Sequence, residues 1–154
     1  MGTMSSDRAS VCKQHLDFMV WADNKMLDAI AKDMPENVSV LQHIYLGETV
    51  WIKRVKGDRT VAIQELPAPA SVSELQKLWP ALHRDWQEIG AKDDCNRIVE
   101  YRRQNVDIAS PLWQIVLHLV NHGSYHRGQV AASLRAAGFP PPPTDLMVYY
   151  RTVA

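Results

Sequence analysis

The chain has 154 residues, and its 17 basic and 17 acidic side chains give a formal net charge of zero. This length supports one domain with a single hydrophobic core, and 46% hydrophobic with 22% charged residues is typical of a globular protein. The balanced charge disfavours nucleic-acid binding. No run of about 18 apolar residues occurs, and residues 1–10 lack the apolar core of a signal peptide. We therefore expect one cytoplasmic domain over residues 1–154, without nucleic-acid or membrane partners.

The first two predicted elements are amphipathic helices. Over residues 8–33 the apolar side chains recur at the spacing of a helix with one buried face. The proline of "MPEN" (34–37) ends this pattern. A second helical pattern covers residues 38–56 and ends at Gly57, a residue type that is common just after a helix.

A third helix follows a connector with two prolines, residues 59–70. In "SVSE" a serine precedes a glutamate by three residues, as in a capping box, which predicts a helix from Ser71 to about Ile89. Pro80 lies inside this helix and should kink it or mark a break near Trp79.

The next segment, residues 96–108, alternates apolar and polar side chains as a short β-hairpin does, although no Asn-Gly or Asp-Gly pair marks its turn. Ser110 as the cap and Pro111 as the first helical residue then predict a last helix, which continues to residue 137 and ends at Gly138. The tail "TDLMVYYR" should pack back onto the helices. Together the elements predict an all-α four-helix bundle with a short β-hairpin before the last helix.

The last predicted helix carries two histidines, His122 and His126, four residues apart. Such positions differ by about 40° around a helix axis, so both imidazoles point the same way and could bind one ion, with zinc and nickel as suitable metals. Gly123 stands where the HExxH motif of metalloproteases needs glutamate, which disfavours that class of enzyme. An HxxxH pair alone is weak evidence. In an apolar helix, however, the imidazoles need partners, because an unsatisfied buried polar group costs roughly 1–3 kcal/mol.

A third ligand could come from another helix, and His43 is the best candidate because it lies beside an apolar stripe of the second helix. A hydrogen-bonded core histidine is the alternative explanation for it. His15 and His83 are rivals, but their acidic neighbours indicate half-exposed positions. His118, one turn before His122, could be a fourth ligand or could orient one.

Three stretches of the chain resemble the DinB/YfiT-like superfamily. "HLVNHGSYHRGQVAASLRAAG" with "TDLMVYY" resembles its C-terminal helix and tail, "FMVWADNKMLDAI" its first helix and "LQHIYLGETVWIKRVKGD" its second. The NHxxxHRGQ element is fairly specific. The resemblance implies a four-helix bundle with a divalent metal site made of His43, His122 and His126. Characterised members of the superfamily include transferases and isomerases that use mycothiol, bacillithiol or glutathione.

Three neutral histidines would leave a bound divalent ion, nickel or zinc, with open positions for water or substrate. A thiol bound there would lose its proton, and a bound water would supply hydroxide. We therefore expect a metal-dependent thiol transferase or hydrolase that acts on a small molecule, with a low-molecular-weight thiol as a candidate cosubstrate and no catalytic side chain assigned. The alternative is a non-catalytic metal-binding, structural or stress-response protein, whose site is closed by His118 or by a carboxylate such as Glu48.

Two further expectations concern packing. Arg127 and Gln129 should tie the last helix to neighbouring segments, with Arg127 in a structural salt bridge and not in a substrate clamp. Five tryptophans are many for one narrow core, so an apolar face should remain for a second copy to cover. The sequence therefore favours a homodimer.

Overall fold

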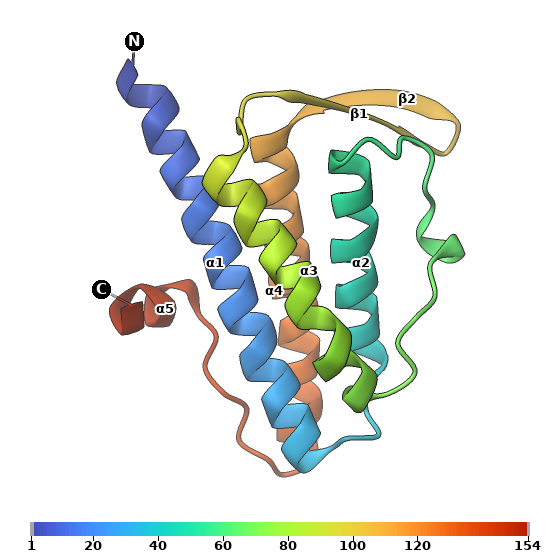
Figure 1. The fold of residues 1–154 in the computed structure, drawn as a ribbon. Coiled ribbons are helices and arrows are strands. Elements are labelled where there is room, and N and C mark those ends of the chain that lie inside the picture. Colours follow the sequence, from blue (N-terminus) through green and yellow to red (C-terminus); the bar gives the residue numbers. More distant parts are fainter. Residues whose placement is uncertain (1, 154) are drawn as a thin grey trace.

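The computed structural model describes the backbone of residues 2–153 and the side chains of residues 6–153. In chain order its elements are α1 (Gly2–Asp33), α2 (Ser39–Val55), the 3₁₀ turn η1 (Ile63–Glu65), α3 (Val72–Lys92), β1 (Ile98–Arg103), β2 (Val106–Pro111), α4 (Leu112–Ala136) and α5 (Leu146–Val153). The four long helices form a bundle, the hairpin crosses one end of it, and α5 lies beside α1 (Figure 1). α1 and α2 each pack against α3 and α4. The predicted four-helix bundle with a hairpin before the last long helix is confirmed.

The long helices differ from the prediction mainly at their ends and at Pro80. α1 begins at Gly2 instead of residue 8, and α3 continues to Lys92. The predicted cap of α3 is confirmed, because the Ser71 hydroxyl accepts a hydrogen bond from the Glu74 N–H at 3.2 Å. The predicted break near Trp79 is wrong, since α3 runs through Pro80 without interruption. Proline removes a single N–H there, and the buried side chains on both sides of it hold the helix against the core.

The hairpin has a two-residue turn that the sequence rules missed. Gln104 and Asn105 both have positive φ, 50° and 63°, which is the backbone of a type I′ turn. Ser110 is not the cap of α4, as the sequence suggested. It is paired in β2, and its hydroxyl lies 3.2 Å from the Tyr101 hydroxyl. α4 therefore begins one residue later, at Leu112, with Pro111 at its N-cap position.

Glycine in place of Asn105 is expected to raise the free energy of unfolding by about 0.5 kcal/mol, because glycine adopts positive φ without the penalty of a Cβ atom. Urea unfolding of the purified protein measures this change. Glycine in place of Ala109, an exposed residue of β2, is the matched control and should instead lower the free energy of unfolding by about 0.5–1 kcal/mol. Destabilisation by both variants would show that the turn is not strained.

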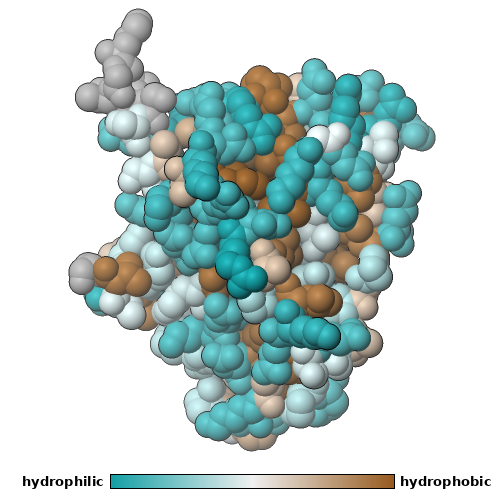
Figure 2. Space-filling model, in the orientation of Figure 1, coloured by the Kyte–Doolittle hydropathy of each residue, from teal (hydrophilic) through white to brown (hydrophobic). Residues whose placement is uncertain are grey.

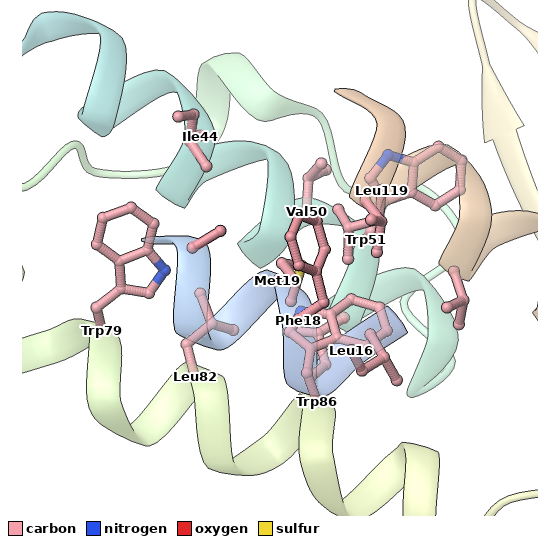
Figure 3. Close-up of a cluster of buried hydrophobic side chains, with 14 of the residues drawn as sticks. Leu16, Phe18, Met19, Ile44, Val50, Trp51, Trp79, Leu82, Trp86 and Leu119 are labelled. Carbon is pink, nitrogen blue, oxygen red and sulfur yellow. The ribbon is translucent and has the colours of Figure 1, made fainter. Parts of the chain in front are cut away.

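The core of the bundle is built around large aromatic side chains. Trp79, Leu82 and Trp86 of α3 point toward α1 and α2 (Figure 3), and both tryptophans are fully buried. Trp51 is also buried and packs on Tyr101 of the hairpin, with ring centroids 5.0 Å apart.

The two remaining tryptophans are partly buried, and segments of the same chain cover part of them. Trp21 contacts Tyr149 of α5 at a centroid distance of 5.4 Å, so the tail packs back as expected. The guanidinium of Arg8 lies over Trp113, 4.8 Å from its ring centroid. Figure 2 shows one face of the molecule as mostly hydrophilic, with hydrophobic side chains between the polar ones. The hairpin and tail thus account for much of the aromatic surface, and the homodimer stays a prediction. No described helix has the length and apolar character needed to span a membrane.

Candidate metal centre

Two helices bring three histidines together at the surface of the bundle. His43 comes from α2, and His122 and His126 from α4. The ring centroid of His43 lies 5.2 Å from that of His122 and 4.4 Å from that of His126. The Nε2 atoms of His122 and His126 are 3.1 Å apart, and one ring nitrogen from each of the three residues lies within 4.8 Å of the others. The residues named from the sequence therefore converge into a group that could hold a metal ion.

The shortest of these spacings, between His122 and His126, fits the chemistry of a divalent ion. Zinc–imidazole bonds are about 2.0–2.1 Å long, so two nitrogens on one ion must lie within about 4.2 Å of each other. The 3.1 Å between the two Nε2 atoms corresponds to bonds that meet at roughly a right angle. Two bare lone pairs at that distance would repel each other, so a proton or a cation must lie between them.

A glycine on α2 makes room for the second imidazole. Gly47 is one turn beyond His43, and a Cβ atom added to it would lie 3.3 Å from Cε1 of His122. That separation is shorter than ordinary van der Waals contact, so a side chain here would displace the ring. Because Gly47 follows His43 by four residues, both lie on one stripe of α2, but the packing role of Gly47 depends on the partner helix.

The environment of His43 and His122 favours the neutral form that binds metals. Burial, together with the positive charge that His126, His43 and His118 would carry, lowers the pKa of His122 to about 4. Burial and then His126 also lower the pKa of His43. Proton competition for these two rings is therefore weak near pH 7.

One hydrogen bond orients the third ring. Nδ1 of His126 lies 2.8 Å from Oε1 of Gln129, one turn further along α4. An amide oxygen accepts, so Nδ1 carries the proton and Nε2 presents its lone pair toward His122. Gln129 was expected to tie α4 to another segment. Its contact to a histidine on its own helix corrects that expectation, and the i, i+3 spacing was the signal that could have revealed it.

The other histidines lie outside this group. His118 stacks on His122 with ring centroids 5.9 Å apart, but it is not among the three residues whose nitrogens converge. His15 approaches the Val11 carbonyl of its own helix at 2.8 Å. His83 is only 3% exposed, so the expectation of a half-exposed side chain was wrong.

A cavity of about 700 Å³ adjoins the three-histidine group, and we call it the hairpin cavity. Its walls come from α2, residues 60–64, the hairpin turn and α4. His43, His118 and His122 line it. Glu48, considered as a closing ligand, lies instead inside the bundle and is 2% exposed. The site is therefore open to a small molecule on this side.

A second group whose distances could suit a metal lies inside the bundle. It consists of Asp23 from α1, Glu48 from α2 and His83 from α3. Arg127 of α4 donates from Nη1 to Oδ1 of Asp23 at 2.8 Å, and Nε2 of His83 is 3.0 Å from Oδ2. Both oxygens of Asp23 are thus engaged, and the guanidinium already supplies the positive charge. We describe these four residues as the buried network. The expected structural salt bridge of Arg127 is confirmed.

The buried network contains one orphaned atom. Trp79 donates from Nε1 to Oε1 of Glu48 at 3.0 Å, whereas Oε2 has no hydrogen-bond donor among the described residues. Burial first, and then the Asp23 carboxylate, raise the pKa of Glu48 well above its usual value. Burial opposes ionisation of Asp23 too, but bonds to Glu48 and His83 and the charge of Arg127 lower its pKa overall. Burial and the nearby Asp23 carboxylate therefore favour a protonated, neutral Glu48 inside the bundle.

Glutamine in place of Glu48 is expected to stabilise the protein increasingly as pH rises above 4.5, the ordinary pKa of glutamate. The unfolded chain releases this proton near that pH, while the folded chain keeps it until its raised pKa. The free energy of unfolding of the wild type consequently falls over that pH interval. That of the glutamine variant does not, because the amide cannot ionise. Urea unfolding at pH 5, 6, 7 and 8 measures the difference, with exposed Glu88→Gln on α3 as control. A difference that is the same at every pH would contradict a raised pKa of Glu48 in the folded chain.

The sequence missed this network because its members are far apart in the chain. The one signal was Asp23, which lies on the apolar stripe of α1 between Met19 and Met26. An acidic side chain on a buried face needs a partner. For Asp23 that partner is Arg127, which lies 104 residues further along the chain.

Comparisons with known proteins agree with this architecture. The model of the DinB family matches residues 10–152. The protein DinB of Bacillus subtilis (strain 168) is 24% identical over 155 aligned residues, which cover 86% of this chain and 90% of that protein. No solved structure matches the chain significantly. Because the family model covers far more than half of its length, the chain belongs to the DinB family.

Proposed function

We propose that this protein binds one divalent metal ion, nickel or zinc, through His43, His122 and His126 and catalyses a reaction of a thiol or of water with a small molecule. The observation that carries the proposal is the convergence of three histidine nitrogens beside an open cavity. When bound, such an ion lowers the pKa of a thiol or a water placed on it, so that a nucleophile exists near neutral pH.

The protein's own side chains would prepare this chemistry. His43 and His122 enter as neutral imidazoles because their surroundings disfavour the protonated ring. Gln129 keeps the proton of His126 on Nδ1, away from the site. The hairpin cavity would hold the organic part of the substrate and limit the water around it. Three protein ligands instead of four leave room for substrate, which favours catalysis over a purely structural site.

The test measures metal and turnover separately. Protein purified without an affinity tag is analysed for metal, stripped with chelator and reloaded with nickel or zinc. Each form is then assayed for displacement of halide from an electrophilic aryl halide by the thiol of glutathione, bacillithiol or mycothiol, and for hydrolysis of activated esters. The proposal expects turnover that appears only with metal. One equivalent of metal without any turnover would support the non-catalytic alternative, and the absence of metal binding would reject both.

A further inference from the structure

The hairpin cavity has an unusual charge. The described residues that line it include no aspartate and no glutamate, but they include Arg54, Arg102 and Arg103 together with His43, His118 and His122. Arg102 is neutralised by Asp107, which its Nε atom contacts at 2.9 Å. Among the described residues, no carboxylate lies within ion-pair distance of Arg54 or Arg103. An excess of positive charge in a concave site attracts anions.

Arg54 is the most informative of these side chains. It is only 8% exposed, and its Nε has no hydrogen-bond partner among the described residues. Its Nη2 makes one long contact, 3.5 Å, to the Val61 carbonyl. A guanidinium has five N–H donors, and a buried charge without a counter-ion is strongly unfavourable. Burial lowers the pKa of Arg54, and the charge of nearby Arg103 adds to this effect. The chain thus gives Nε no acceptor and Nη2 only a long contact, so the guanidinium can still donate to an acceptor from outside the chain.

Two aromatic rings hold this guanidinium in place. Its Cζ lies 4.6 Å from the ring centroid of Trp51 and 5.3 Å from that of Tyr101. Stacking of this kind stabilises the cation and limits its rotation, while its in-plane N–H groups stay available. Arg54 is therefore positioned before any ligand arrives. Trp51 also contacts His118, with ring centroids 5.4 Å apart, which links the arginine to the histidine side of the cavity.

We propose that the hairpin cavity binds the oxyanion group of its small-molecule ligand, with Arg54 as the principal binding residue and Arg103 as a second positive charge at the entrance. A planar carboxylate or a phosphate can accept two parallel N–H bonds from one guanidinium, which an uncharged group cannot match. The anionic end would then anchor the ligand while its reacting end faces His43 and His122. The role of this ligand as substrate rests on the proposed function, whereas anion binding itself does not.

Calorimetric titration of metal-free protein at low ionic strength tests the inference. The probes are succinate, inorganic phosphate and, as an uncharged match for succinate, succinamide. Wild-type protein should bind at least one anion and not succinamide, and the preferred anion distinguishes a carboxylate ligand from a phosphate ligand. In Arg54→Gln the Kd should rise at least about tenfold, and in Arg54→Lys by less, because charge is kept but the planar fork is lost. Exposed Arg84→Gln on α3 should leave Kd unchanged.

A second variant keeps the inference testable even if Arg54→Gln fails to fold. Arg103 is exposed at the hairpin turn, so Arg103→Gln should fold normally and raise Kd about threefold. Equal affinity of wild type and the Arg54 variants, or failure of the wild type to bind either anion, would overturn the inference. Metal content and thiol transfer are measured in parallel. If the protein binds the anion but takes up no nickel or zinc when these are supplied, the proposed function alone is rejected. Metal-dependent turnover without an effect of the Arg54 variants on anion binding would reject this inference alone.

Discussion

Alanine in place of His126 is expected to reduce bound nickel or zinc from about one equivalent to less than a tenth. The same result is expected for His43 and His122, because each supplies one of three converging nitrogens. Loss of a hydrogen-bonding partner behind a ligand typically weakens metal affinity 10–100-fold. Loss of the ligand itself should therefore weaken it on the order of 100-fold or more. Elemental analysis after gel filtration measures the metal content of each variant.

Two further variants distinguish loss of a metal ligand from a general loss of structure. Gln129→Ala should weaken affinity about tenfold, because it removes the acceptor that keeps the His126 proton on Nδ1 but no ligand. His15→Ala is the matched control, since His15 lies on α1, outside the three-histidine group, and its Nδ1 contacts the Val11 carbonyl of the same helix. It should keep full metal content. If all three ligand variants still carry one equivalent of metal, the ion is bound elsewhere, and the buried Asp23, Glu48 and His83 group becomes the first alternative.

How far the sequence could predict this molecule depends on how local each signal was. Helical spacing and a capping box are local, so the four helices and the Ser71 cap were predicted correctly. The turn at Gln104 and Asn105 was missed because positive φ is carried there by residues other than glycine. Ser110 was misread as a cap because a serine before a proline fits both a strand end and a helix start.

The convergence of two of the candidate metal ligands was predictable for a different reason. His122 and His126 are one turn apart, so the backbone alone places them together. His43 was preferred over the other histidines because it lies beside an apolar stripe of the second helix, and the family resemblance implied the same residue. The opening of the site onto a cavity with Arg54, by contrast, depends on how the hairpin folds over α2, and no pattern within one element contains that information.

Replacement of Arg127 by methionine is expected to lower the free energy of unfolding by about 3–5 kcal/mol, the range for removal of one partner of a buried ion pair. Arg127 is 1% exposed, and Asp23, its partner, is completely buried. Without the guanidinium, Asp23 must remain as an uncompensated charge or take up a proton. Its neighbour Glu48 cannot replace the lost positive charge, and burial together with Asp23 raises the pKa of Glu48 well above its usual value.

The local packing of α4 is adapted to this arginine. A Cβ atom added to Gly123 would lie 2.6 Å from Nη1 of Arg127. Gly123 lies one turn before Arg127 on α4, and only glycine at this position leaves enough space for the guanidinium. Nη2 also donates to Ser124 at 3.2 Å. Gly123→Ala should consequently destabilise the protein by displacing the same ion pair, although alanine favours helices more than glycine does.

Urea unfolding at pH 7 measures these effects, and Arg135→Met, on the exposed last turn of α4, is the matched control with an expected loss below about 1 kcal/mol. The double variant Asp23→Leu with Arg127→Met decides the cause. If the damage comes from the stranded carboxylate, the double variant should be more stable than Arg127→Met alone, because both charges leave the core together. A double variant whose loss equals the sum of the two single losses would instead assign the effect to lost packing, and the buried network would have no electrostatic role in stability.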